Sequence, residues 1–431
     1  MIQPLLHQDI FHQQLSRELY AILDWWRQNT VDETYGGFIG QMDGHGVVHP
    51  QADKGIILNT RILWTFSAAA RHADRPAYRQ LADRAFRYLL DHFRDAEAGG
   101  FFWMLDYRGQ PIETKKQVYA QAFAVYALSE YYLLTQQPEA LEAARQTFAL
   151  IERHSLDPTR NGYLDAFSRD WQLLDDLRLS AKDANAAKTM NTHLHLLEAY
   201  TNLLRAGPDA ALSQALENLL DLFTDKFIDP DGHLQLFFDE NWQPQSDLIS
   251  FGHDIECSWL LVEAAEALGH ASWLEKAKST ALRIAEATLT QGVDTDGALF
   301  NEANAQGLHD KDKHWWPQAE AIVGFLSAWD ISGQEKFYDA AVRAWQFIQH
   351  YLLDPALGEW RWRVDRAGIP DLSEDKVSQW KCPYHNGRAC LEGIRRLGGK
   401  GQETGDRSKE TGVNWLKPYS PKAQKINNKT P

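Results

Sequence analysis

Apolar residues recur along this chain at helical spacing, in segments separated by short glycine-containing stretches. The clearest segment is 79–93, whose apolar side chains fall on one stripe: Leu81, Ala85, Phe86, Leu89, Leu90 and Phe93. Charged residues such as Asp83 and Arg87 occupy the opposite face, a pattern that predicts an amphipathic helix with one side on a core. Similar patterns predict helices near 8–28, 140–155, 211–227, 272–289 and 335–353.

A second set of helical segments is apolar on all sides. One such segment follows each amphipathic helix after a glycine-containing stretch, over about 55–71, 115–134, 190–206, 252–268, 314–331 and 384–397. Because a helix that is apolar all round must be covered on every face, these segments suit an inner layer. The two sets therefore predict an outer and an inner layer of helices.

The glycine-containing stretches form a repeat. Each contains a glycine followed by a bulky apolar run, and the six glycines recur at intervals of 61 to 70 residues: Gly37, Gly100, Gly162, Gly232, Gly297 and Gly358. The runs reach polar turn residues such as Asp43 and Gly44 and often resume afterwards, which is typical of a short β-hairpin. We therefore expect six small hairpins.

Six units of two helices give twelve, which predicts an all-α (α/α)6 barrel with the hairpins at the rim of a pocket. An open helical solenoid is the alternative. We expect one catalytic domain over 1–397. From residue 398 the chain is polar and rich in lysine, so 398–431 is predicted to be a flexible tail.

Composition narrows the function. The formal charge of −15 argues against nucleic acid and anionic membrane surfaces, which are bound mainly through Lys and Arg. No apolar run approaches the roughly 18 residues of a membrane-spanning helix, and Met1 to His12 lacks a signal-peptide pattern, so a cytoplasmic protein is expected. The three cysteines show no CxxC spacing and are predicted to be reduced. The 16 tryptophans suit sugar stacking or a large core.

Polar and aromatic side chains concentrate in the first turns of the predicted inner helices. These turns hold Asn59 and Arg61; Tyr119 and Gln121; Asn191, His193 and His195; His253, Asp254 and Glu256; His314, Trp315, Trp316 and Glu320; Tyr384, His385, Asn386 and Arg388. If the inner helices run in the same direction, their first turns meet at one mouth, which predicts a single deep pocket.

Helical spacing indicates which of these side chains share a face. Asn191 and His195 are four residues apart, and His253 and Glu256 are three apart, so Glu256 is expected to orient His253. His193 and His195 point about 200° apart, and only one of them should face the pocket.

The sequence leaves open the role of three charged side chains and the presence of a metal site. Arg61, Glu320 and Arg388 either bind the ligand or form an ion-pair ring in the mouth. A metal site built from His193, His195, His253 and Glu256 is a further alternative. Because His193 and His195 diverge on a helix, no metal is expected.

Four segments resemble the N-acylglucosamine 2-epimerase family, especially its cellobiose 2-epimerase branch: SAKDANAAKTMNTHLHLLEAY, FGHDIECSWLL, KHWWPQAEAIVGF and WKCPYHNGRACLE. The resemblance extends over about residues 10–397. It implies the (α/α)6 barrel, in agreement with the repeat.

The resemblance also implies roles for individual residues. It makes His253 and His385 the proton-transfer pair, His195 the stabiliser of the intermediate, and Glu256 and Asp183 supporting carboxylates. The positions that match its sugar-contacting residues are Arg61, Tyr119, Asn191, Glu302, Trp316 and Trp380.

The implied reaction is inversion of C2 of an aldose, either at the reducing end of a β-1,4 disaccharide such as cellobiose or on a free sugar. One histidine would remove the C2 proton to give a cis-enediolate and another would return a proton to the opposite face. Neither a GxGxxG strand–helix motif nor a phosphate-binding loop is present, so no cofactor is expected.

Three alternatives remain. The first is a mannose 2-epimerase or aldose–ketose isomerase that acts on free monosaccharides. The second is an inverting glycosidase, with carboxylates drawn from Asp183, Glu256 and Glu320. The third is a non-catalytic binding protein on the same barrel. The expected partner is a small sugar, and the expected assembly is a monomer or homodimer.

Overall fold

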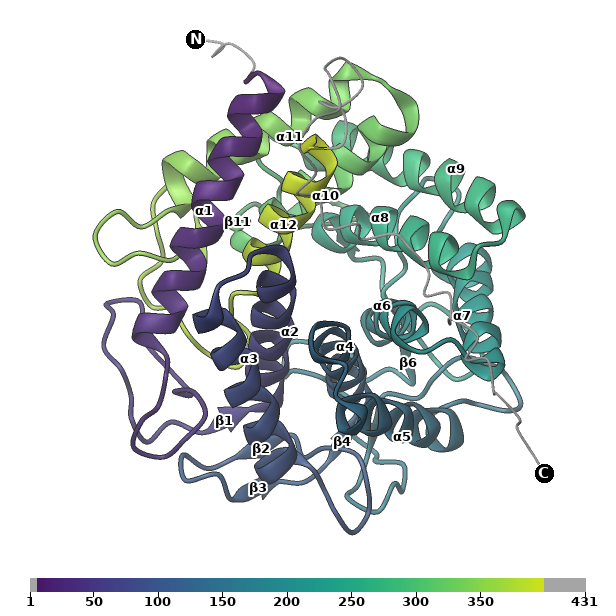
Figure 1. Ribbon diagram of the computed structural model, residues 1–431. Coiled ribbons are helices and arrows are strands. Elements are labelled where there is room, and N and C mark those ends of the chain that lie inside the picture. The colour runs from purple at the N-terminus through teal and green to yellow at the C-terminus, as the bar shows by residue number, and fades with distance from the viewer. Residues whose placement is uncertain (1–5, 399–431) are drawn as a thin grey trace, which may run out of the picture.

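The protein, as described by a computed structural model over residues 6–398, is built from helices that alternate between two layers (Figure 1). The outer helices are α1 (Gln8–Asn29), α3 (Pro76–Tyr88), α5 (Pro138–His154), α7 (Ala210–Leu222), α9 (Ala271–Ala287) and α11 (Glu335–Phe347). The inner helices are α2 (Ile56–His72), α4 (Val118–Thr135), α6 (Met190–Ala206), α8 (Phe251–Leu268), α10 (Trp315–Ser332) and α12 (Tyr384–Gly398). All twelve predicted helices are confirmed. Most of the predicted tail, 399–431, lies outside the described residues.

Four outer helices end in a wider π-helical turn. These turns are η1 (Leu89–Phe93), η2 (Phe223–Phe227), η3 (Thr288–Gly292) and η4 (Ile348–Leu352). They continue the apolar stripe of the helix before them, which is why the sequence pattern runs on without a break to 93, 227, 289 and 353.

The inner helices form a closed ring. Each packs against the next, from α2 through α4, α6, α8 and α10 to α12, and α12 packs against α2. Figure 1 shows this ring surrounded by the outer helices, with α1 beside α12. The molecule is therefore a closed (α/α)6 barrel and not an open solenoid.

Burial distinguishes the two layers as expected. Every residue of α2 from Ile56 to Ala69 is buried, whereas α3 buries only one stripe that includes Leu81 and Phe86. No helix in the described part of the chain is long and apolar enough to cross a membrane.

Short strands join neighbouring units at one end of the barrel. The two-residue strand before an inner helix pairs with the hairpin of the following unit: β1 (Lys54–Gly55) with β2 (Met104–Leu105), β4 (Lys116–Gln117) with β5 (Ala166–Phe167), β6 (Lys188–Thr189) with β7 (Phe237–Phe238), β8 (Ile249–Ser250) with β9 (Glu302–Asn304), and β11 (Lys313–His314) with β12 (Arg363–Val364). A bridge from Met42 to Val377 joins the first unit to the last.

The predicted hairpins are present, although most are very short. β2 pairs with β3 (Pro111–Glu113) and β9 with β10 (Gly307–Asp310), while single bridges close the other hairpins. The sequence pattern predicted pairing within each unit. It did not reveal the pairing between units, which depends on ring closure.

The fourth residue of several inner helices holds a hairpin in place. Gln121 accepts a hydrogen bond from the Phe101 amide at 2.8 Å and donates one to its carbonyl oxygen at 2.9 Å, and Gln318 does the same with Leu299 at 2.7 and 2.9 Å. Asp254 accepts from the Leu234 amide at 2.8 Å. Several polar residues of the first turns therefore have structural roles.

Candidate active site

Three histidines on three different inner helices meet at the hairpin end of the barrel. His195 comes from α6, His253 from α8 and His385 from α12. Burial lowers the pKa of His253, and the nearby imidazoles of His195 and His385 lower it further. The ring of Trp316 lies 4.7 Å from the ring of His253 and 5.6 Å from that of His385, measured between centroids. The structure thus brings together the three histidines that the sequence singled out.

Each of these imidazoles has a partner at Nδ1, and the partners differ. Nδ1 of His195 lies 3.0 Å from a carboxylate oxygen of Glu198, and Nδ1 of His385 lies 2.7 Å from Glu320. Nδ1 of His253 instead lies 2.8 Å from the hydroxyl oxygen of Ser250. The expectation that Glu256 orients His253 was wrong, because Glu256 is turned toward Arg388.

Arg388 is a buried guanidinium that connects two of these pairs. It donates to Glu198, to Glu256 at 2.5 Å and to Glu320 at 2.7 Å. Glu198 and Glu320 are the carboxylates that hold His195 and His385, so one cation holds both supporting acids in place. Of the two alternatives left open for these residues, an ion pair joins Arg388 and Glu320, whereas Arg61 pairs with no carboxylate of the described residues.

The carboxylates around Arg388 differ in how readily they take up a proton. Burial raises the pKa of Glu256, and the negative charge of Glu320 raises it further. For Glu320, burial opposes ionisation, but the guanidinium of Arg388 and the bond to His385 outweigh burial and lower its pKa. Glu320 is therefore ionised at neutral pH, and Glu256 is the member of the group that takes up a proton most readily.

Burial favours the neutral form of these histidines. It lowers the pKa of both His253 and His385 to about 3, and it lowers that of His195 against the opposing effect of Glu198. A neutral imidazole has a free lone pair on one ring nitrogen, so each of these side chains is able to accept a proton.

Arg61 carries a buried positive charge that acts on both His195 and His385. Its guanidinium donates to the hydroxyl of Tyr119 at 2.8 Å and lies 4.3 Å from the ring of Phe123. Among the described residues no carboxylate pairs with it, and its Nε has no hydrogen-bond partner. A buried cation without an acidic partner is suited to an anionic or strongly polar ligand group.

Several predicted sugar contacts surround this centre. The ring of Tyr119 lies 4.9 Å from that of His195 and 6.2 Å from that of Trp380. Asn191 shares a helix with His195, and its side-chain oxygen has no hydrogen-bond partner. Tyr119 therefore links His195 to Trp380, and the side-chain oxygen of Asn191 is available to accept a hydrogen bond.

In the described part of the chain, neither Glu302 nor Asp183 hydrogen-bonds to a histidine of the site. Glu302 pairs across β8 and β9 with Ser250, and burial raises its pKa. The Asp183 carboxylate accepts a bond from the Ser180 amide at 2.8 Å within its own loop. Asp165, which precedes β5, accepts from the hydroxyls of Thr189 and Thr192 at the start of α6. Burial raises the pKa of Asp165 to about 7, and the charge of Asp183 adds to this shift. Asp183 is thus near α6 but is not bonded to the histidines.

Two residues that hydrogen-bond to the histidines, Glu198 and Ser250, were not predicted from the sequence. Glu198 is three residues after His195 on α6, so the spacing rule that suggested Glu256 for His253 would have found it. Ser250 precedes α8 and carried no signal, because it lay outside the predicted helix. The pairing of His385 with Glu320 joins two helices and has no local signature.

The described residues contain two groups able to hold a metal ion, Glu256 with Glu320 and His385, and Asp310 with Asp312 and His314. In the first group Arg388 already supplies the positive charge. The predicted divergence of the HxH pair is confirmed, since the His193 ring bonds to the Thr189 carbonyl oxygen at 2.7 Å and to the Tyr163 amide at 2.9 Å, away from His195.

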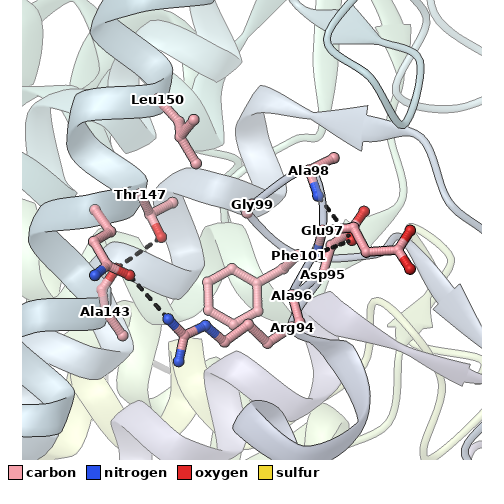
Figure 2. Close-up of a pocket in the computed structure, with 12 residues that line it drawn as sticks. Arg94, Asp95, Ala96, Glu97, Ala98, Gly99, Phe101, Ala143, Thr147 and Leu150 are labelled. Atoms are coloured by element: carbon pink, nitrogen blue, oxygen red, sulfur yellow. Dashed lines mark hydrogen bonds between the residues drawn. The ribbon is translucent and has the colours of Figure 1, made fainter.

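A cavity of about 260 Å³ lies elsewhere, between α5 and residues 94–101 (Figure 2). It is lined by Arg94, Glu97, Gln146 and other outer-layer side chains, and none of the three histidines contributes to it. We therefore place the candidate site at the histidines, where the ionisable groups converge, and not at this cavity.

Comparison with known proteins gives one consistent result. Residues 37–389 match the N-acylglucosamine 2-epimerase (GlcNAc 2-epimerase) family. The chain is 48% identical to a cellobiose 2-epimerase of Bacteroides fragilis, over 89% of this chain and 98% of that protein. The solved cellobiose 2-epimerase of Bacillus thermoamylovorans superposes with a TM-score of 0.86 at 41% identity, covering 90% of this chain and all of that one. A D-mannose isomerase of Marinomonas mediterranea is more distant, at 24% identity over 85% of this chain and 93% of that protein.

Proposed function

This chain belongs to the N-acylglucosamine 2-epimerase family, in its cellobiose 2-epimerase branch, and we propose that it inverts C2 at the reducing end of a β-1,4 disaccharide such as cellobiose. It is an isomerase that interconverts the glucose and mannose configurations. The observation that carries the proposal is the convergence of His195, His253 and His385 from three inner helices, with the ring of Trp316 beside His253 and His385.

The chemistry follows from the acidity of the C2 proton. Opening of the sugar ring exposes a C1 aldehyde, and loss of the C2 proton then gives a cis-enediolate in which the C–H electron pair forms the C1–C2 double bond. Nε2 of one histidine takes this proton, and the other histidine returns a proton to C2 from the opposite face. His253 and His385, from different helices, are the proposed pair. The ring of Trp316 lies close to both.

Negative charge that develops on O1 requires stabilisation. We assign this role to His195, together with the unneutralised guanidinium of Arg61, since buried donors aimed at a developing oxyanion typically lower a barrier by about 3 kcal/mol each. Tyr119, Asn191, Glu302, Trp316 and Trp380 are proposed to hold the sugar. Glu256 and Asp183 are proposed as supporting carboxylates, Glu256 through Arg388.

The proposed partner is a small neutral sugar, because a net charge of −15 disfavours nucleic acid and anionic membranes. A cytoplasmic location and a monomer or homodimer are part of the same proposal. We expect no cofactor, since the histidines alone can carry both proton transfers. Full activity after dialysis against a chelator is the expected result, whereas restoration by an added metal or nucleotide would contradict it.

A second candidate is an isomerase of free monosaccharides. The distant similarity to a D-mannose isomerase favours it as the runner-up. Chemically the two reactions share the enediolate, which gives the epimer when it is reprotonated at C2 and a ketose when it is reprotonated at C1. Which sugars react, and at which carbon the proton returns, separates the two candidates.

Proton NMR in D2O tests the proposal directly. The enzyme is incubated with cellobiose, mannose and N-acetylglucosamine in separate samples. We expect deuterium at C2 and a mannose-terminated disaccharide from cellobiose, with the glycosidic bond intact. Release of glucose would instead indicate a glycosidase, and fructose from mannose would indicate the runner-up.

Variants connect the activity to the site. His253→Asn and His385→Asn are expected to lower kcat by at least about 10²-fold, the usual contribution of a general acid or base. The matched control is His350→Asn, an exposed histidine on η4 whose ring bonds only to the backbone of Gln346. Unchanged turnover in His385→Asn would contradict the assignment, and turnover of none of the three sugars by the unmodified enzyme would contradict the proposed function.

A further inference from the structure

The hydroxyl of Ser250 is the Nδ1 partner of His253, and this contact differs in kind from those of the other two histidines. His195 and His385 face the carboxylates Glu198 and Glu320, which in their ionised state only accept hydrogen bonds. Ser250 is neutral, 3% exposed, and 2.8 Å from Nδ1 of His253. The titratable groups that act on His253 are His195, His385 and Glu320, and none of them is bonded to its Nδ1.

The hydroxyl of Ser250 does not cap the helix that it precedes. Ser250 is the N-cap of α8, a position where serine ordinarily accepts a hydrogen bond from a backbone amide of the first turn. Thr189, the N-cap of α6, does so with the Thr192 amide. Ser250 makes no such bond, and its hydroxyl is turned to the imidazole of His253.

We propose that Ser250 is a positioning residue that accepts the Nδ1 proton of His253 and so keeps Nε2 directed at the sugar. This inference rests on the proposed function and extends it by one residue. A neutral imidazole carries its proton on one nitrogen only, so a hydroxyl that accepts the Nδ1 proton leaves the lone pair of Nε2 free to react. Without the hydroxyl, His253 is free to move its proton to Nε2 or to rotate.

The proton balance is the same in both directions. As a base, His253 takes the C2 proton on Nε2 and becomes an imidazolium. Its Nδ1–H group meanwhile keeps its hydrogen bond to the Ser250 oxygen. As an acid, it returns the Nε2 proton to C2 and becomes neutral, and Nδ1–H again stays in place. Because the partner is a neutral hydroxyl and not a carboxylate, it holds the ring in both states without strongly favouring the imidazolium.

The two epimers react first with different histidines, which makes the role of Ser250 measurable. In D2O, deuterium at C2 of the recovered starting sugar reports an enediolate that was reprotonated on its original face. Formation of the epimer reports reprotonation on the other face. The ratio of these two outcomes is the partition of the intermediate, and it is measured separately from cellobiose and from its mannose-terminated epimer.

Weakening His253 alone must change the two partition ratios in opposite directions. From the epimer that His385 deprotonates, delivery by His253 becomes slow, so exchange into the starting sugar increases relative to inversion. From the epimer that His253 deprotonates, the enediolate forms slowly but His385 delivers normally, so relative exchange falls. The equilibrium constant is unaffected, and kcat/KM falls by the same factor in both directions.

The experiment uses Ser250→Ala and Ser250→Gly, both without a hydroxyl, since glycine is also tolerated at an N-cap. We expect kcat to fall about tenfold or more with little change in KM, together with the opposite shifts in partition. Ser250→Thr, which keeps the hydroxyl, should restore both ratios. The control is Ser258→Ala on the same helix, whose hydroxyl bonds to the Ile255 carbonyl oxygen at 2.7 Å and which should leave both ratios unchanged.

Partition ratios equal to those of the unmodified enzyme in a folded, slower Ser250 variant would overturn the proposal, because a purely structural defect slows both faces alike. Equal shifts in the same direction would also overturn it. Neither result would affect the proposed function, which fails only if the unmodified enzyme does not epimerise.

Discussion

Glu256 and Glu320 are buried carboxylates that share the guanidinium of Arg388, yet they differ in what else they contact. Glu320 also accepts from Nδ1 of His385 at 2.7 Å and from the Trp259 indole at 3.1 Å. Glu256 has only Arg388 among the side-chain hydrogen-bond partners of the described residues. The negative charge of Glu320 raises the pKa of Glu256, whereas the pKa of Glu320 is lowered. A neutral glutamine is therefore a closer substitute for Glu256 than for Glu320.

We therefore predict that Glu320→Gln lowers kcat about 10²-fold and that Glu256→Gln lowers it less than about tenfold near neutral pH. The glutamine at 320 removes the charge that holds His385, whereas the glutamine at 256 replaces a carboxyl that readily takes up a proton. Steady-state rates of both variants on the same substrate check the order. Equal losses would mean that the two carboxylates act as one unit around Arg388.

The close approach of α8 and α10 depends on two glycines. A methyl group on Gly252 would lie 2.5 Å from the ring of Trp316, and one on Gly324 would lie 2.5 Å from the side chain of Ile255 and 2.6 Å from its carbonyl oxygen. Gly252 leaves room for Trp316 beside His253, while Gly324 sets the distance between the two helices deeper in the barrel.

The two glycines should respond differently to alanine. Gly252→Ala is expected to displace Trp316 and lower kcat/KM with a small change in thermal stability. Gly324→Ala is expected to lower the free energy of unfolding by about 1–3 kcal/mol, the usual cost of overpacking. Gly387→Ala, whose added methyl group would meet only Thr65 at 3.2 Å, is the stability control. Activity and denaturant midpoints of the three variants separate the effects, and an unchanged kcat/KM in Gly252→Ala would contradict the role given to Trp316.

The barrel is completed by contacts between α1 and the last repeat unit. The Trp26 indole of α1 donates to Glu359, which also binds Lys381 and Asn386. Glu18 of α1 accepts from the Trp360 indole at 2.7 Å. Because His385 follows Lys381 by four residues, the same contacts that close the ring also set the start of α12.

Glu18 makes this closure dependent on pH. Burial raises the pKa of its carboxyl from 4.5 to about 7 in the folded state. The folded protein thus binds this proton more tightly than the unfolded chain, so the associated stability is complete below about pH 4.5 and is lost as the pH rises to 7. Glu18→Gln, which keeps the oxygen that accepts from Trp360, should therefore stabilise the protein by about 3 kcal/mol at pH 8 and have little effect near pH 4.

Thermal unfolding at the two pH values checks this prediction. Glu33→Gln, an exposed carboxylate in the first unit, removes the same charge and should change the midpoint little at either pH. A Glu18→Gln variant that is no more stable than the unmodified protein at pH 8 would contradict it.

The amino-acid sequence by itself determined the twelve helices, their two layers and the divergence of His193 from His195. These features follow from helical periodicity and from a repeat of 61 to 70 residues, both of which are local properties of the chain. The family resemblance, confirmed by relatives at 48% and 41% identity, identified the histidines as a set.

Only the tertiary structure decided how the histidines are held. Glu320 reaches His385 from another helix, Arg388 joins Glu198 to Glu320 across the ring, and Ser250 takes the place predicted for Glu256. Closure of the barrel and strand pairing between units were likewise open until the ring was seen. The physical reason is that spacing along one helix shows which side chains share a face, whereas the partner of a buried charge is set by how separate helices pack.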